Sequence, residues 1–277
     1  MNVLFFQITL ALYLGGTIAY LIYILSSHER AAWAGRYLLG IGFIIHCLTF
    51  IVRYVEAGHP PVVNLHESLS FFAWMVVGFF LLLRYQYKDK VEVLGAFVAP
   101  LALLLVIWAA ALPKEILPLP PSLKSWWLPI HVTFAFLGDA IFALAFCAGV
   151  IYLIQERLVK SRRIGTLSGR LPSLEVLDEI NYRALTIGFP LLTIGIVTGA
   201  VWAEYAWGSY WSWDPKETWS LITWLLYAAL LHQRLTVGWR GKKAAIMAIV
   251  GFGAVLFTFL GVNLLMEGLH TYSEWFR

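Results

Sequence analysis

The sequence is short of charge. Only 13% of its 277 residues are Asp, Glu, Lys or Arg, whereas 60% are hydrophobic, and the mean hydropathy is +0.76. A chain of this composition has too little polar surface to cover a water-soluble globule. The composition therefore excludes a soluble protein and predicts one that lies in a membrane.

Cysteine is nearly absent as well. Cys47 and Cys147 each lie inside an apolar run, and neither a CxxC nor a CxxCH motif occurs. This usage is typical of small buried side chains rather than of a redox pair or a haem attachment site.

The sequence also shows no strand pattern, no clear internal repeat and no second domain.

The first apolar run, near 4–25, has no basic start and no small-residue cleavage site after it, so we expect it to be retained as a span. Apolar runs of about 20 residues, the length that crosses a bilayer, occur at 4–26, 36–55, 67–85, 91–112, 128–156, 183–203, 216–235 and 242–265. The predicted fold is all-α: a polytopic membrane protein of about eight transmembrane helices, with residues 1–277 in one integral-membrane domain.

The positive charges predict its orientation. A net charge of +4 can indicate a nucleic-acid partner, but in a membrane protein the positions of the charges matter first. If the connections between spans are assigned alternately to the two sides, 15 of the 20 Lys and Arg fall on one side. By the positive-inside rule, both termini lie outside. We expect no nucleic-acid partner, a location in the bacterial cytoplasmic membrane and a functional face on the periplasmic side. The longest inner connection, near 157–183, has apolar residues at helical spacing and predicts an amphipathic helix on the inner surface.

One outer connection, at about 202–219, is crowded with aromatic residues. Interfacial tryptophans explain one or two per helix end, but not this density, which favours a platform for a large, flat, apolar ligand. The predicted platform begins in the preceding span and ends in the following one. We assign to it Trp202, Trp207, Gly208, Tyr210, Trp211, Trp213 and Trp219.

The same connection ends in the sequence DPKE. Asp214 suits a helix N-cap, Pro215 the first helical position, and Glu217 lies three residues after the cap. This pattern predicts a capping box that opens the seventh span, with a second role for these residues at the ligand left open.

Two histidines are predicted at the level of this connection. His131 opens the fifth span and His270 follows the eighth. Neutral imidazole is a common iron ligand, and two of them can bind a tetrapyrrole from opposite faces. His46, near the middle of the second span, is a third candidate ligand because an ionisable group at that depth is costly, and Arg53 on the same helical face is a candidate partner for a propionate. Asp139, also within a span, has no partner that the sequence identifies.

The stretch WGSYWSWDPKETW resembles the tryptophan-rich (WWD) signature of haem-handling cytochrome c assembly proteins, and the chain as a whole is similar to the CcsA (ResC-like) membrane subunit family of the system II cytochrome c synthase. The similarity includes LPIHVTFAF around His131 and GVNLLMEGLHTY around His270. The resemblance implies that these two histidines hold haem b at the outer face and that His46 serves a second haem position within the membrane.

The resemblance also implies a function. The chain would bind haem and present it for thioether attachment to an apocytochrome c with a CxxCH motif, as part of a holocytochrome c synthase (haem lyase). Its implied partners are a CcsB (ResB-like) subunit, the apocytochrome and thiol-reducing proteins. It would contribute no catalytic residue of its own, only orientation of the haem. The alternatives are a system I haem lyase or exporter subunit, a non-catalytic regulator of haem synthesis, and a secondary transporter.

Overall fold

A computed structural model describes residues 1–116, 118–162 and 169–269. Within these residues the chain is helical and contains no strand, which confirms the all-α prediction for this part of the sequence. The chain divides into two compact units. Unit 1 consists of Met1–Pro118 and Ile151–Leu177, and unit 2 of Leu119–Val150 and Asp178–Arg277.

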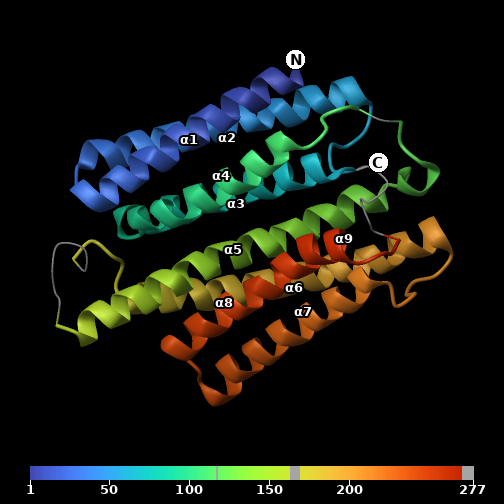
Figure 1. The fold of residues 1–277 in the computed structure, drawn as a ribbon. Helices are drawn as coiled ribbons and strands as arrows, with labels where there is room; N and C mark the ends of the chain where they lie inside the picture. Colours follow the sequence, from blue (N-terminus) through green and yellow to red (C-terminus); the bar gives the residue numbers. More distant parts are fainter. Residues whose placement is uncertain (117, 163–168, 270–277) are drawn as a thin grey trace. The chain divides into compact units, whose positions relative to one another are not determined.

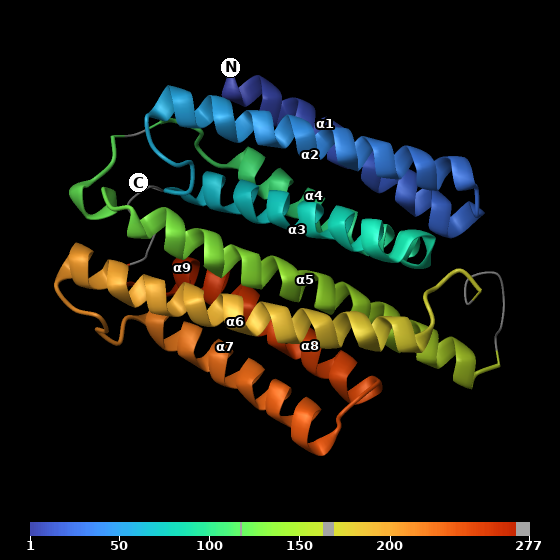
Figure 2. The same cartoon turned by 180° about the vertical axis from the view of Figure 1, so that it is seen from behind.

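Unit 1 is built mainly from the first four long helices. These are α1 (Asn2–Ser26), α2 (Glu29–Ala57), α3 (Leu65–Tyr87) and α4 (Gly95–Ala111), with the 3₁₀ segment η1 (Lys88–Leu94) between the last two. Helices α1 and α2 form an antiparallel pair, as do α3 and α4 (Figures 1 and 2). Glu92 of η1 ties three helices together: its carboxylate accepts from the Tyr20 hydroxyl at 3.1 Å, from Arg36 at 3.0 Å and from Arg84 at 2.7 Å.

Unit 2 contains the remaining helices. They are the 3₁₀ turn η2 (Pro121–Leu123), α5 (Trp127–Lys160) as far as Val150, α6 (Leu174–Trp207) from Asp178, α7 (Pro215–His232), the π-helical η3 (Gln233–Val237), α8 (Lys242–Leu256), the π-helical η4 (Phe257–Gly261) and α9 (Val262–Leu265).

Helices α5 and α6 meet through glycines. A methyl group on Gly138 of α5 would lie 3.1 Å from the backbone nitrogen of Leu192, and one on Gly195 of α6 would lie 2.9 Å from the backbone nitrogen of Ala135. Small residues of this kind let two helix backbones approach closely. The relative position of α5 and α6 is therefore set by backbone contact.

The prediction of a separate amphipathic surface helix after residue 170 was wrong. Its apolar positions are helical, but they form the first turns of α6, which continues unbroken to Trp207. Leu177 and Ile180 are fully or almost fully buried. The acidic residue between them, Asp178, pairs with Arg234 at 2.6 Å. The amphipathic pattern thus reflects packing inside the protein.

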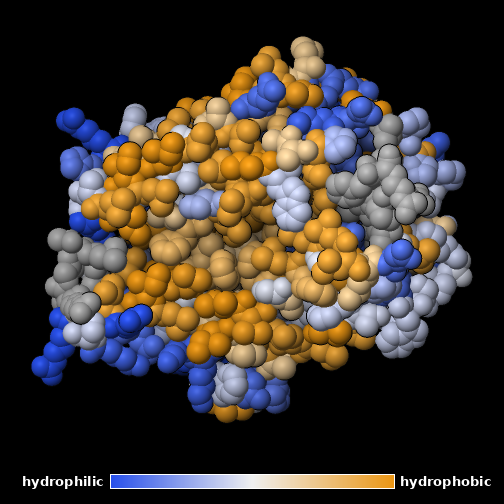
Figure 3. Space-filling model, in the orientation of Figure 1, coloured by the Kyte–Doolittle hydropathy of each residue, from blue (hydrophilic) through white to orange (hydrophobic). Residues whose placement is uncertain are grey.

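All eight apolar runs lie mainly in helices. By length and composition, six helical stretches of the described residues can cross a membrane: Asn2–Ser26, Glu29–Ala57, Leu65–Ala111, Trp127–Lys160, Leu174–Trp207 and Lys242–Leu265. The 47-residue stretch Leu65–Ala111 contains two of the predicted runs, and the run at 216–235, which forms most of α7 and η3, is not among the six. Apolar side chains cover much of the visible helix surface (Figure 3). The number of eight spans, the single domain and the outward orientation of the termini stay predictions.

Candidate functional site

The aromatic connection is a short, well-braced loop. Helix α6 ends at Trp207, where Gly208 takes a left-handed conformation with φ of 76° and its N–H donates to the Glu204 carbonyl. Glycine adopts this conformation without steric cost, which stops the helix cleanly. Seven residues later α7 begins at Pro215.

The predicted capping box is confirmed. The Asp214 carboxylate accepts from the backbone N–H of Lys216 at 2.9 Å, and Glu217 accepts from the backbone N–H of Asp214 at 3.1 Å. Glu217 also accepts from the backbone N–H of Ser212 at 2.8 Å. The two acids therefore satisfy the open donors of the α7 N-terminus and hold the end of the loop in place.

Asp214 has a second contact that its sequence position did not reveal. Its other oxygen accepts from the backbone N–H of Leu269 at 2.6 Å, and the side chain is largely buried. A methyl group on Gly268 would lie within 2.4 Å of this oxygen, so only glycine allows the close approach. Asp214 thus fastens the segment after α9 to the start of α7. His270 lies outside the described residues, immediately after this anchored segment.

His131 is held in a defined tautomer. Its Nδ1 lies 2.8 Å from the carbonyl oxygen of Gly195. Because a carbonyl oxygen only accepts, Nδ1 carries the proton and the lone pair of the neutral ring is on Nε2. Metal-binding histidines are typically oriented in this way, with one ring nitrogen donating to a carbonyl and the other directed to the metal.

The His131 ring also has a fixed plane. It is nearly parallel to the indole of Trp202, at 14° and 6.0 Å between centroids. On the opposing helix, a methyl group on Gly199 would come within 2.7 Å of two atoms of the ring. Gly195 and Gly199 are four residues apart and so face the same side of α6. The sequence signal for this arrangement, a GxxxG spacing in α6, was not used in the prediction.

The tryptophans of the aromatic connection differ in burial and in the contacts they make. Trp202 is buried, donates from its indole nitrogen to the Ser122 carbonyl at 3.2 Å, and meets the Trp207 ring edge-on at 4.8 Å. Trp211 and Trp213 form a second edge-to-face pair at 5.6 Å. Trp213, 69% exposed, and Tyr210, 59% exposed, present aromatic surface outward. Trp219 instead packs on Phe257 of η4 at 4.2 Å, within the helices.

His46 and Arg53 lie in unit 1 and are fully engaged there. The two ring nitrogens of His46 pair with the Tyr13 hydroxyl at 3.2 Å and the Ser70 hydroxyl at 2.7 Å. Arg53 is bonded to Glu67 at 2.6 Å and also donates to two backbone carbonyls. Iron ligation by His46, or propionate binding by Arg53, would require these bonds to break.

The arrangement in unit 2 fits a flat iron-containing ligand. It combines one imidazole whose Nε2 lone pair is oriented by the fold, outward-facing aromatic rings in the adjoining loop, and an anchored segment that leads directly to a second histidine. A porphyrin offers the complementary features, an apolar plane and axial iron positions.

Comparisons with family models and with known sequences point to the same family. A model of the family described as cytochrome C assembly protein matches residues 62–270. A cytochrome c biogenesis protein CcsA from Chlamydomonas reinhardtii is 46% identical over 243 residues, which is 86% of this chain and 68% of that protein. A CcsA from Synechococcus elongatus is 42% identical over 269 residues, 81% of this chain and 82% of that protein.

A solved structure shares the fold. The cytochrome c heme lyase CcmF superposes with a TM-score of 0.68 at 19% sequence identity. The match covers 97% of this chain but only 47% of that one, so the chain spans just under half of CcmF.

Proposed function

We propose that this chain, which belongs to the cytochrome c assembly protein family and resembles its CcsA members, handles haem for cytochrome c maturation. It binds haem b at the outer end of unit 2 and presents it to an apocytochrome with a CxxCH motif. The observation that carries this proposal is the hydrogen bond from His131 Nδ1 to the Gly195 carbonyl, which commits Nε2 to acting as the acceptor or ligand nitrogen.

The loop supplies the remaining contacts. Trp207, Trp211 and Trp213 provide ring faces for the porphyrin, while Trp202 supports His131 from behind. Trp219, whose ring packs on Phe257, stays a predicted member of the platform at its inner edge. Asp214, Pro215 and Glu217 act through the backbone: they form the start of α7 and so hold the end of the aromatic loop in place beside the haem.

The reaction places a cysteine thiol of the apocytochrome across a vinyl group of haem. One C–S bond forms at one vinyl carbon and the thiol hydrogen ends on the other, so the addition needs no oxidant. The chain contributes orientation rather than a nucleophile: holding vinyl and thiol in register supplies the rate as effective concentration. The histidine of the incoming CxxCH motif can then replace one of the two axial histidines.

Partners complete the system. The proposal includes a CcsB (ResB-like) membrane subunit and thiol-reducing proteins that keep the CxxCH cysteines reduced. Together these form a holocytochrome c synthase in the bacterial cytoplasmic membrane, with the active face outside.

The proposal is tested by producing the chain with a ResB-like subunit and a secreted CxxCH reporter. We expect the purified complex to retain haem and the reporter to acquire covalent haem, read by haem stain after denaturation. A reporter with both cysteines replaced by serine is the control and should stay unstained. Purification of a stable complex that neither retains haem nor labels the reporter would contradict the proposal.

Gly199→Ala gives a more specific test of the His131 geometry. The added methyl group must displace the ring, so we expect haem occupancy to fall by roughly 10–100-fold, the usual cost of disturbing a ligand's supporting contacts. Occupancy is read from the absorption spectrum of the purified complex. Gly253→Ala in α8 is the matched control, because nothing lies within 4 Å of a methyl group there. Equal occupancy in both variants would show that His131 is not held as described.

A further inference from the structure

Asp139 places a carboxyl group inside a helix that is long and apolar enough to cross a membrane. It lies on α5 one turn before Phe142, so the two residues share a face of that helix. Phe142 stacks on Tyr227 of α7, with 3.6 Å between ring centroids and 11° between ring planes, and this face of α5 is therefore turned toward α7. Ionisable groups within membrane spans are rare and usually functional.

The Asp139 carboxyl makes no hydrogen bond and no ion pair with any residue that the structure describes. The groups that act on it electrostatically are the Lys216 ammonium and the Tyr227 hydroxyl, which lie about three turns apart on one face of α7. Lys216 itself donates to Oδ1 of Asn263 at 3.2 Å. A buried carboxylate without a hydrogen-bond partner is costly, and a bound proton removes its charge.

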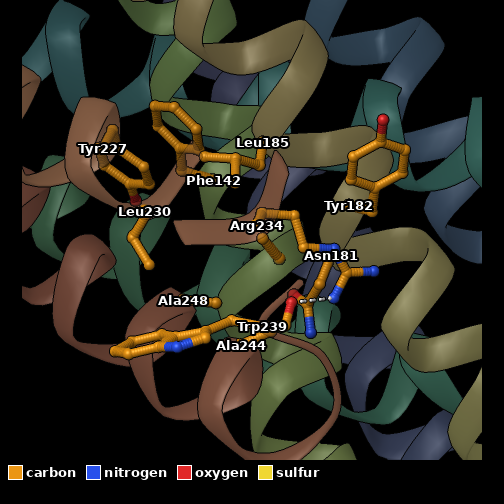
Figure 4. A pocket seen from close by; sticks show the side chains of 11 residues that line it. Phe142, Asn181, Tyr182, Leu185, Tyr227, Leu230, Arg234, Trp239, Ala244 and Ala248 are labelled. Carbon is orange, nitrogen blue, oxygen red and sulfur yellow. Dashed lines mark hydrogen bonds between the residues drawn. The ribbon is translucent and has the colours of Figure 1, made fainter. Parts of the chain in front are cut away.

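A small cavity adjoins Tyr227, between α5, α6, α7 and α8 (Figure 4). Its volume is about 30 Å³, which has room for water but not for a larger ligand. Two buried polar atoms of its lining, the Tyr227 hydroxyl and Oδ1 of Asn181, have no partner among the described residues. Buried polar groups are almost always hydrogen-bonded, so we expect water in the cavity to satisfy both atoms.

The lining of the cavity extends to the protein surface, at the end where α7 turns into α8. It includes Tyr182, which is 37% exposed, and Arg234. Arg234 is held in place by the Asp178 carboxylate, at 2.8 and 2.6 Å. At the inner end of the cavity the Tyr227 hydroxyl is also fixed, because a methyl group on Gly251 of α8 would lie 2.9 Å from its oxygen. The cavity thus leads from the surface to an immobilised hydroxyl group.

We propose that Asp139 is a proton-binding site, supplied by water through this cavity. The proton comes from water at the Arg234 end and reaches the water beside Asn181. That water gives a proton to the Tyr227 hydroxyl, which passes its own proton toward the Asp139 carboxylate. Asn181 accepts a hydrogen bond from the water and only holds it in place. Each relaying oxygen gains one proton and loses one, so nothing is oxidised or reduced.

Such a site would let the interior of unit 2 gain or lose one unit of charge without the movement of a helix. The route uses no histidine and no tryptophan of the proposed haem site. The sequence singled out Asp139 for its depth alone, whereas the cavity and the Tyr227 hydroxyl supply the path to it.

The test uses infrared spectroscopy of the full chain in nanodiscs of ether-linked phospholipid, whose lack of ester carbonyls leaves the carboxylic acid region clear. The spectrum of Asp139→Asn is subtracted from that of the wild type. We expect the difference to contain the C=O stretch of one protonated carboxyl, which loses intensity as the pH rises and moves to lower frequency in D₂O. Asp139→Glu keeps a carboxyl group and should keep a band of this kind.

Tyr227→Phe tests the route. It removes the hydroxyl group but keeps the ring that stacks on Phe142. The D₂O shift of the Asp139 band should become about tenfold slower, because the chain loses one hydrogen bond. Tyr182→Phe is the matched control: it removes the hydroxyl of a lining residue that points away from Tyr227 (Figure 4), and the shift should keep its wild-type rate.

A difference spectrum without a carboxyl band that responds to pH would overturn the proposal. Equal exchange rates in Tyr227→Phe and the wild type would overturn the route through the cavity. The experiment reads no haem and no maturation, so its result is independent of the proposed function.

Discussion

His131→Gly is expected to remove haem from the outer site and to stop maturation of a CxxCH reporter. Loss of an oriented axial ligand should reduce haem occupancy by about 100-fold or more, because even its supporting contacts are worth roughly 10–100-fold. Glycine also leaves a space of the size of the imidazole ring beside Trp202. We therefore expect free imidazole to restore part of the occupancy and of the low-spin haem spectrum.

His28→Gly provides the control for this experiment. His28 precedes α2 in unit 1, and its ring nitrogen is bonded only locally, to the Ser26 carbonyl at 3.0 Å. Its removal should leave both the spectrum and the reporter unchanged. A His131→Gly variant with wild-type spectrum and full maturation would rule out His131 as a ligand.

Asp214→Ala is expected to have the second largest effect. It removes the N-cap of α7, worth about 1 kcal/mol, and the charged hydrogen bond to Leu269, worth about 1.5–3 kcal/mol. Without that bond the segment that leads to His270 is held less firmly to the start of α7. Maturation should therefore fall to the level of His270→Gly, and free imidazole should rescue the two variants to a similar degree.

Asn64→Ala separates anchoring from capping. Asn64 caps α3 in unit 1 by accepting from the Glu67 N–H at 2.9 Å, so its loss costs a helix cap but touches no part of the site. The Asn64→Ala variant should lose about 1 kcal/mol of stability, the value of a helix cap, and should retain maturation. If Asp214→Ala matured the reporter as well as Asn64→Ala does, Asp214 would be a helix cap and nothing more.

What could be predicted from the sequence was local. The capping box depends on residues three apart, and its pattern sufficed to identify Asp214 and Glu217 correctly. The eight apolar runs were likewise found as helices because each is continuous in the sequence. Membership of the cytochrome c assembly protein family was recognised from the tryptophan-rich stretch together with the sequences around His131 and His270.

What escaped prediction depends on partners far along the chain. The bond from Asp214 to Leu269 joins residues 55 positions apart, and Arg53 is bonded to the carbonyl of Lys114, 61 positions away. The contact of the Trp219 ring with Phe257 was likewise not predicted. Such pairings are decided by how helices pack, which a hydrophobic pattern specifies only as a buried face.

The glycine contact between α5 and α6 would make the two sides of the proposed haem site differ in how firmly they are held. His131 is fixed by backbone atoms that cannot be repacked without separating two helices. The segment that ends at Leu269 is held to the start of α7 by a side chain, because its backbone N–H donates to one Asp214 carboxylate oxygen. In the proposed exchange, a histidine of the apocytochrome would displace the ligand that follows Leu269, while His131 keeps its hold on the haem. If haem is bound as proposed, this difference predicts that His270, rather than His131, is the ligand that leaves when the apocytochrome arrives.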